Sequence, residues 1–445
     1  MEKREYGLFT AIAMIVGIVI GSGIFFKSDN ILIYTGGSII KGVLVFSIAA
    51  VGIIFGSLSI SILASKTTKA GGLITYADEY SGRKTACAFG WFQVFIYYPS
   101  LVGVLSWVAA VYICMLFNIP NTPEILGMIG ALAAAFCFVM NILSSAMGGY
   151  FQNASTIIKM IPLGAIAIAG FIYGDPHMVT TAEKTMEITS SATWLAALAP
   201  VAFSYDGWVV STSIAHELKN SKRNLPLALT IGPIFVLVAY ILYFVGISIM
   251  VGPENIMKQG DNHVNIAAIK IFGANGAKIV LTFIVISVMG TLNGFILGFI
   301  RLPYSLALRE MLPMSEKLKI VSEKTNTPVY SARIAIIVSI IWSWINYMVQ
   351  KNNLIPNSDA SEIPIVASYI IYIILYVHVI KLYRKGEVQG IVKGVIIPIL
   401  AMIGSAIIII GGLQNPRTLI YIGICVAVII AVSYTHLTLP TTSRV

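Results

Sequence analysis

Two short segments of this chain combine residue types that can bind a small charged molecule. The first is Gly21-Ser22-Gly23, inside an apolar stretch that runs from Leu8 to Ile33. A helix crosses a bilayer with roughly 20 residues, but glycine weakens a helix interior. A break at the midplane exposes N–H and C=O groups that lipid cannot satisfy, so it persists only beside a cavity. A helix restarting near Gly23 would direct its free N–H groups at an anion. Close helix–helix contact through small residues is the alternative interpretation.

The second segment is Asp206-Gly207, which follows the apolar stretch that begins at Trp194. An ionisable side chain at membrane depth is by default a candidate functional residue. An Asp206 that is merely structural, close to water or to a partner, is the alternative. The two breaks fall in the first and the sixth apolar stretch, and paired breaks in corresponding positions of two halves indicate a transporter with inverted repeats.

The composition places both segments in a polytopic membrane protein. The 445 residues are 57% hydrophobic and 11% charged, with a mean hydropathy of +0.87, whereas soluble domains are roughly 45–50% apolar. No cleavable signal peptide is evident, so the first span is expected to stay. The net charge of +10 lies mostly in short loops, which orients the chain and does not indicate nucleic-acid binding. The cysteines and histidines lack the spacing of metal ligands or of catalytic pairs, so no metal, no cofactor and no enzyme are predicted.

The elements that must position the two breaks are transmembrane helices. We expect an all-α membrane protein with twelve spans, at residues 7–34, 38–64, 86–117, 125–146, 155–173, 193–217, 227–250, 276–308, 331–349, 363–383, 391–412 and 417–433. Lysine and arginine are concentrated on the side shared by both termini, which predicts that the N- and C-termini are cytoplasmic. The expected location is a cell membrane, the inner membrane of a bacterium. A short surface helix is expected at residues 264–271.

The chain divides into two related halves under this interpretation. The first inverted repeat is expected at residues 1–173 and the second at 193–383, followed by two additional spans at 391–433. Residues 434–445 change abruptly to polar composition, so we expect a non-native tail. A natural short polar tail is the alternative.

Several motifs resemble those of the amino acid–polyamine–organocation superfamily, and within it the L-type amino acid transporters and the bacterial serine/threonine or alanine/serine/cysteine exchangers. The resemblance extends from about residue 7 to 432. The residues that carry it are Gly21 to Phe25, Gln152-Asn153 with Thr156 and Lys159, Tyr205 to Trp208, Glu217 to Asn220, and Gly290 to Gly294 with Arg301. It implies twelve transmembrane helices in a five-plus-five inverted repeat with discontinuous first and sixth helices.

The first break suits the carboxylate of an α-amino acid. The backbone N–H groups of Ser22, Gly23 and Ile24, together with the Ser22 hydroxyl, would make charge-assisted hydrogen bonds to it. The resemblance implies that the carbonyls of Val19, Phe203 and Ser204 accept from the α-ammonium. It also implies a gate and unwound segment formed by Gly21, Phe203, Tyr205, Asp206 and Gly207, although ordinary packing would also explain Phe203.

Further roles follow from the resemblance. Lys159 would replace a sodium ion by bridging the first and eighth spans, and a snorkelling interfacial lysine is the alternative. Ile96, Tyr97 and Tyr369 would line the side-chain pocket. Glu217 and Arg301 would form a cytoplasmic gate, together with Arg223, unless they are only solvated helix ends.

These expectations combine into one leading hypothesis. The chain would exchange small to medium neutral L-amino acids without sodium, by alternating access around a midplane site. A proton-coupled amino acid symporter and an amine or polyamine antiporter are the alternatives, and Asp206 favours each of them. The expected partners are the amino acid and the bilayer, with an accessory subunit or a homo-oligomer left open.

Overall fold

The computed structural model describes residues 7–21, 23–67, 72–179, 192–209, 219–325, 327–355 and 358–414, together with residues 423, 425 and 427. This part of the chain is helical, and its β pairing is limited to an isolated bridge between Ser322 and Thr327. Nine of its helices are long and apolar enough to cross a membrane. The expected all-α membrane protein is therefore confirmed.

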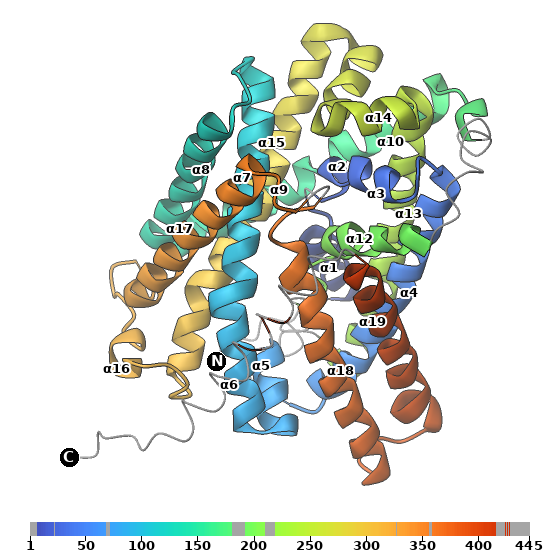
Figure 1. The fold of residues 1–445 in the computed structure, drawn as a ribbon. Helices are drawn as coiled ribbons and strands as arrows, with labels where there is room; N and C mark the ends of the chain where they lie inside the picture. The colour runs from blue at the N-terminus through green and yellow to red at the C-terminus, as the bar shows by residue number, and fades with distance from the viewer. Residues whose placement is uncertain are drawn as a thin grey trace.

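The helices follow one another along the whole described chain (Figure 1). They are α1 (Leu8–Val19), α2 (Gly23–Phe26), α3 (Ser28–Tyr34), α4 (Ile39–Ala64), α5 (Gly72–Tyr76), η1 (Ala77–Ser81), α6 (Arg83–Phe92), η2 (Gln93–Tyr97), α7 (Tyr98–Phe117), α8 (Pro123–Leu143), α9 (Ser145–Ile158), α10 (Met160–Tyr173), η3 (Ala192–Ala197), α12 (Leu198–Ser204), α13 (Ser221–Val251), α14 (Pro253–Gln259), η5 (Gly260–Asn262), α15 (His263–Ala307), α16 (Ser315–Leu318), α17 (Val329–Lys351), α18 (Glu362–Arg384), η6 (Val392–Ile396) and α19 (Ile397–Leu413).

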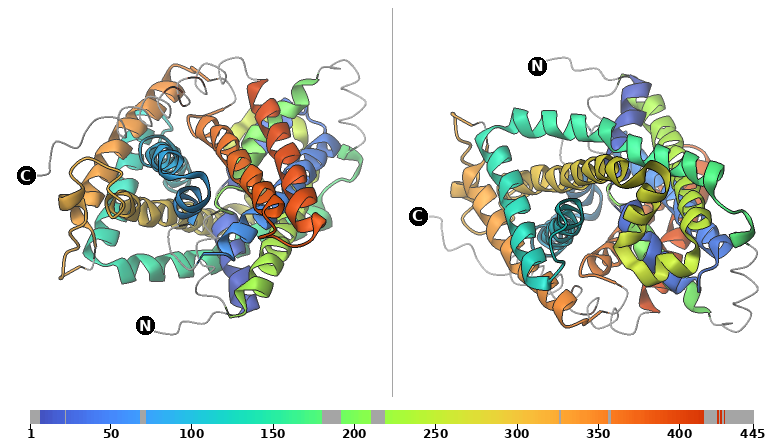
Figure 2. Two further views of the ribbon diagram at one scale, coloured as in Figure 1. Left: turned by 90° about the horizontal axis from the view of Figure 1, so that it is seen from below. Right: turned by 90° about the horizontal axis from the view of Figure 1, so that it is seen from above.

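The helices form two groups that lie side by side in both end-on views (Figure 2). In the first group, α7 packs against α8, α15 and α17. In the second group, α4 lies between α13 and α19, and α13 also contacts α1 and α10. Small residues bring helices of the second group together, since a Cβ built on Gly52 of α4 would lie 3.1 Å from the Cα of Gly404 in α19. Such close approach is how membrane helices associate without a hydrophobic driving force.

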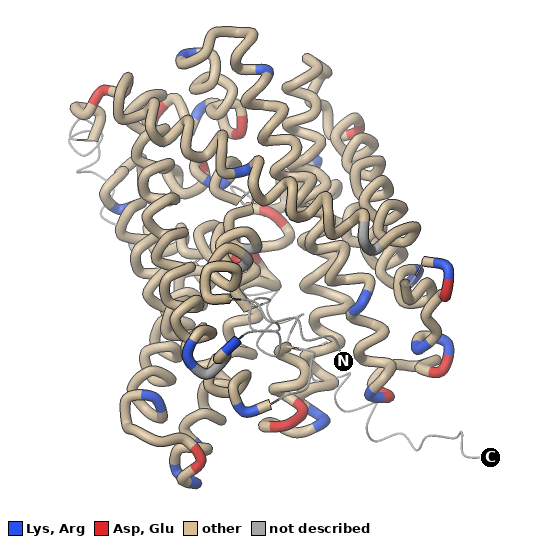
Figure 3. The backbone as a smooth tube through the Cα atoms, turned by 180° about the vertical axis from the view of Figure 1, so that it is seen from behind, with Lys and Arg blue, Asp and Glu red and all other residues tan. Residues whose placement is uncertain are grey.

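Charged residues gather at the two ends of the molecule, and the middle is mostly uncharged (Figure 3). The lower end in Figure 1 holds the end of α4 and the beginnings of α6 and α17. The upper end holds α3, α14 and the beginning of α8. This distribution matches a slab of lipid around the middle, because charge at the bilayer centre is costly.

The first apolar stretch is interrupted at the expected place. α1 ends at Val19, and Ile20 has extended backbone angles of φ −68° and ψ 92°. The helix resumes at Gly23 as α2 and continues into α3, since the N–H of Lys27 donates to the Gly23 carbonyl at 2.9 Å. In the sixth stretch, α12 ends at Ser204 and a turn follows through residues 205–209.

Two elements differ from the expected spans or refine them. The helix of the fifth expected span begins at Ser145 instead of residue 155. The Ser144 hydroxyl caps α9 there by accepting from the Met147 N–H at 3.2 Å. α15 contains the expected surface helix of residues 264–271, which is separated from the membrane part of α15 by Gly273 at φ 66°. The buried side of this surface helix includes Val264 and Ala267.

Candidate functional site

The two interrupted helices meet inside the molecule. A Cβ built on Gly23 would lie 2.8 Å from the Cα of Ser204, so only glycine permits this approach. The rings of Phe26 and Phe203 meet edge to face, 5.3 Å apart. The first helix break therefore lies directly against the end of α12, far away in the sequence.

The interruption frees carbonyl groups at the end of α1, and two buried side chains from other helices donate hydrogen bonds to them. The Ile20 N–H still donates to Val16, so Gly17 is the first carbonyl whose i+4 donor is lost. The Lys159 ammonium donates to this Gly17 oxygen at 2.6 Å. The Tyr240 hydroxyl lies 3.0 Å from the Val19 oxygen.

Tyr240 was not singled out from the sequence, yet it joins the two breaks. Its hydroxyl also lies 2.7 Å from the Ser204 oxygen. A hydroxyl carries only one proton, so it can donate fully to only one of these two carbonyls at a time. The Phe203 oxygen accepts from the Asp206 N–H at 3.0 Å in the turn after α12. Two of the three carbonyls predicted to hold an ammonium, those of Val19 and Ser204, thus lie together at one tyrosine hydroxyl.

A small cavity opens beside this junction. Its volume is about 20 Å³, which is room for about one water molecule. Six predicted site residues line it, and four unpredicted ones complete it: Val19, Gly21, Gly23, Phe203, Ser204 and Asp206, with Leu101, Leu105, Thr291 and Phe295. The signal for Thr291 was available in the motif that begins at Gly290, whereas the two leucines and Phe295 carry no distinguishing pattern.

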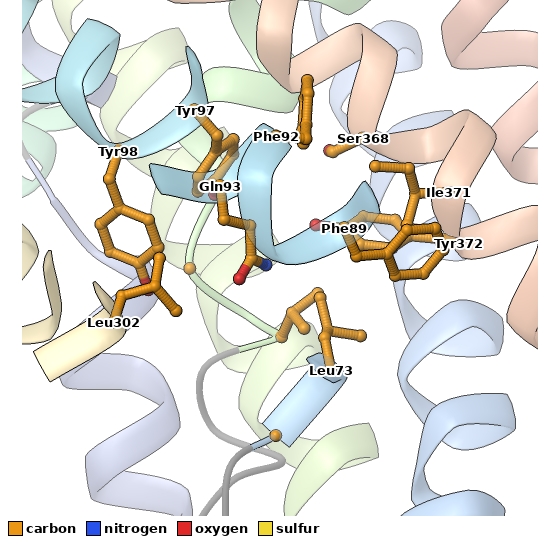
Figure 4. A pocket seen from close by; sticks show the side chains of 13 residues that line it. Leu73, Phe89, Phe92, Gln93, Tyr97, Tyr98, Leu302, Ser368, Ile371 and Tyr372 are labelled. Carbon is orange, nitrogen blue, oxygen red and sulfur yellow. The ribbon is translucent and has the colours of Figure 1, made fainter. Parts of the chain in front are cut away.

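A second cavity of about 120 Å³ is lined by Gly207, the neighbour of Asp206, and by Tyr97 (Figure 4). Its walls come from α5, α6, η2, α7, α15, α18 and the turn after α12. The Tyr97 hydroxyl donates to the Asp206 carboxylate at 2.5 Å. This hydrogen bond stands between the two cavities. Tyr97 belongs to η2, a π-helical turn, and such turns occur frequently at functional sites.

Lys159 lies at the junction of α9 and α10 with only 1% of its surface exposed. Its ammonium is therefore shielded from solvent, which argues against a snorkelling lysine. The side chain of Ser155, one turn earlier, would clash with a Cβ on Gly290 of α15, so α9 lies against both α1 and α15 here. The hydrogen bond to Gly17 is the part of the expected bridge that is present, and the contact to the eighth span stays a prediction.

An ion-pair cluster, which sequence reasoning missed, covers the upper side of the junction. Lys27 follows Phe26 of the broken first helix and pairs with Asp359 at 2.6 Å and with Glu362. All three residues are buried, and the Lys27 ammonium lies 5.1 Å from the centre of the Phe203 ring. Burial alone would raise the pKa of Asp359, but the neighbouring ammonium holds that pKa below its usual value.

The remaining predicted residues stand apart from the cavities. Ile96 and Tyr369 are buried, but they are not among the described residues that line either cavity. Tyr205 is buried with its ring 5.2 Å from that of Tyr240. Arg301 is exposed on α15. Ser22 and Glu217 lie outside the described residues, as does the tail of residues 434–445.

Metal chemistry finds no support in the described residues, where no three His, Cys, Asp or Glu side chains are grouped to hold an ion. The arrangement instead suits non-covalent binding of a small zwitterion. The first N–H groups of α2 have no partner within that helix, and neither do the last carbonyl groups of α1.

Comparison with known proteins agrees with this geometry. The family model described as amino acid permease matches residues 6–434. The chain is 31% identical over 408 residues to the serine/threonine exchanger SteT of Bacillus subtilis, covering 91% of this chain and 90% of that protein. It is 29% identical over 344 residues to the mouse b(0,+)-type amino acid transporter 1, covering 76% and 70%. It is 27% identical over 336 residues to the human cystine/glutamate transporter, covering 73% and 65%. The chain therefore belongs to the amino acid permease family.

Proposed function

We propose that this permease exchanges small to medium neutral L-amino acids across the cell membrane, without sodium, by alternating access to the junction of the two helix breaks. The observation that carries the proposal is the approach of Gly23 to Ser204 beside a cavity that Val19 and Asp206 also line. Backbone donors and acceptors thereby converge on one small volume from two helices.

The two ends of a zwitterion fit the two kinds of backbone group. The N–H groups of Ser22, Gly23 and Ile24 bind the carboxylate at the positive end of the restarted helix. The ammonium binds among the carbonyls of Val19, Phe203 and Ser204. Because the single proton of the Tyr240 hydroxyl cannot satisfy two carbonyls at once, the ammonium supplies the hydrogen bonds that this hydroxyl leaves unmade.

The lining of the cavity favours a neutral side chain of modest size. Leu101, Leu105 and Phe295 give an apolar wall, and the Thr291 hydroxyl adds one polar group. Asp206 disfavours an acidic side chain by like-charge repulsion. The relative named as a serine/threonine exchanger supports substrates of this size.

The cavity of about 20 Å³ is too small for an amino acid, so binding requires movement of its walls. We assign this movement to rocking of one of the two helix groups around the midplane site, within a protein of twelve transmembrane helices whose two five-helix inverted repeats are residues 1–173 and 193–383. The basic residues of the lower end (Figure 3) support placing that end, and both termini, in the cytoplasm.

Proton-coupled symport is the second candidate, and the burial of the Asp206 carboxylate behind Tyr97 favours it. Counterflow in proteoliposomes distinguishes the two functions. The purified protein is reconstituted with or without 5 to 10 mM internal serine, and uptake of labelled amino acids is followed in sodium or choline buffer, with and without an inward pH gradient. Competition with zwitterions and with diamines tests for an amine antiporter.

Exchange predicts uptake that depends on internal serine, that is equal in sodium and choline, and that the pH gradient leaves unchanged. Uptake into empty liposomes driven by the pH gradient would contradict exchange and support symport. Stronger competition by diamines than by zwitterions would contradict the amino acid substrate.

A further inference from the structure

A groove of about 610 Å³ lies at the lower end of the second helix group. It opens where α4 ends, where α13 begins and where η6 leads into α19, so it lies at the level at which membrane helices meet the lipid headgroups. Neither helix break reaches it, and substrate binding does not use it.

The polar residues of the groove suit a phosphate group. Lys66 follows α4 and Lys393 lies in η6, so two ammonium groups from separate elements face one hollow. Both lysines are exposed, and no described carboxylate forms an ion pair with either. Ser61 and Ser65 lie one turn apart on α4 and line the same hollow. Their hydroxyls now donate to backbone carbonyls of α4, at 2.7 Å and 2.8 Å, and can turn to a phosphate oxygen.

An apolar track leaves the groove along α4. Leu58 and Ile62 form the apolar floor of the groove. Further along the same helix, Val51, Leu44 and Ile40 are each about half exposed, at 50%, 47% and 52%. Intervals of four and seven residues place these five side chains on one face of the helix.

Exposed apolar residues of the neighbouring helices border this track on both sides. On α13 they include Ile231, Ile234 and Val238, and on α19 they include Ile399 and Ile403. Since α4 contacts both α13 and α19, the exposed apolar residues of the track have exposed apolar neighbours on two adjoining helices. The part of the track nearest the groove, from Ile62 to Val51, covers about 16 Å of helix, which suits an acyl chain of one lipid leaflet that begins at the polar groove.

We propose that this groove binds an anionic phospholipid, with its phosphate held by Lys66, Lys393 and the two serine hydroxyls and one acyl chain along α4. Basic pockets between transmembrane helices on the cytoplasmic side are typical sites for anionic headgroups. The apolar track favours a lipid over a free phosphate as the ligand, because a soluble phosphate would not contact the track.

Native mass spectrometry of the intact protein, with defined lipids added after delipidation, tests this proposal. Phosphatidylglycerol is compared with phosphatidylcholine for the unaltered protein, for a Lys66→Gln/Lys393→Gln variant and for a Lys317→Gln/Lys324→Gln control of the same net charge. The two control lysines are exposed at the same end of the molecule, outside the groove. Glycerol 3-phosphate is added in a separate arm as a soluble headgroup.

We expect phosphatidylglycerol to bind at least tenfold more tightly than phosphatidylcholine. The groove variant should lose about 25-fold of that affinity, since each lysine near an anionic lipid contributes about fivefold, and the control variant should lose less than twofold. Equal binding of the two lipids, or equal losses in the two variants, would overturn the site. Competition by millimolar glycerol 3-phosphate that displaces the lipid would overturn the role of the acyl track.

Discussion

At the scale of single residues, the site depends on side chains that occupy freed backbone carbonyls. Lys159 and Tyr240 reach the end of α1 from two other helices and donate to Gly17 and Val19. Unsatisfied polar groups inside a membrane protein cost several kcal/mol each, so these two donors stabilise the interruption of the first helix. They also leave the carbonyls in place for a substrate that brings its own protons.

Replacing Lys159 tests whether its charge supports transport without sodium. In Lys159→Ala the Gly17 carbonyl loses its donor, and a buried group left unsatisfied costs about 1–3 kcal/mol. We expect serine exchange in choline buffer to fall at least tenfold while the protein still elutes as a single species. Lys278→Ala, at an exposed position of α15, is the matched control and should retain full exchange. Normal sodium-independent exchange by Lys159→Ala would refute the role of the ammonium.

At the scale of helices, two interrupted elements must approach each other closely. Gly23 permits the restarted first helix to touch the backbone of Ser204, and any Cβ there would have to displace backbone atoms. The contact joins segments that carry opposite backbone polarity. The approach of α2 to α12 is therefore a requirement of the site and not only of the fold.

A single methyl group tests this requirement. Gly23→Ala places its Cβ 2.8 Å from the Ser204 Cα, so α2 or α12 must shift and separate the donors from the acceptors. Exchange should drop more than tenfold. Gly164→Ala in α10, where a Cβ meets no atom within 4 Å, should transport like the unaltered protein. Equal exchange by the two variants would show that the contact does not position the substrate.

At the scale of the whole molecule, the structure is closed above the junction. Lys27, between α2 and α3, pairs with Asp359 and with Glu362 at the start of α18, and its ammonium lies 5.1 Å from the centre of the Phe203 ring. A cavity of about 200 Å³ is lined by Lys27 and Asp359 from the upper side, and it shares no lining residue with the small cavity beside Phe203. This separation describes a conformation in which the upper path is shut by a buried ion-pair cluster.

Breaking the cluster should open the upper path. Removing one partner of a buried ion pair costs about 3–5 kcal/mol, so Lys27→Met destabilises the closed conformation. A Thr291→Cys reporter in the small cavity should then react at least tenfold faster with a membrane-impermeant thiol reagent added from that side. Lys258→Met, which breaks an exposed pair with Glu254, should change the rate less than twofold. Unchanged labelling after Lys27→Met would exclude the cluster as a gate.

The class of protein and the position of the two breaks could be predicted from the amino-acid sequence. Glycine and aspartate inside apolar stretches conflict with a continuous helix in lipid, and that conflict is local, so it can be recognised from neighbouring residues alone. The same local logic placed Gly23 and Asp206 at the site, the family resemblance added Val19 and Ser204, and all four line its cavity. The start of α9 was misplaced, because a serine cap overrode the apolar pattern.

The distant side chains that complete the site became evident from the packing of the helices. Lys27 and Asp359 are 332 residues apart, and Tyr240 resembles any other aromatic residue of an apolar helix until its hydroxyl is placed between two carbonyls. Such pairings depend on how whole helices pack and rotate against one another. A local sequence pattern does not predict that packing, since many arrangements of the helices bury the same apolar faces equally well.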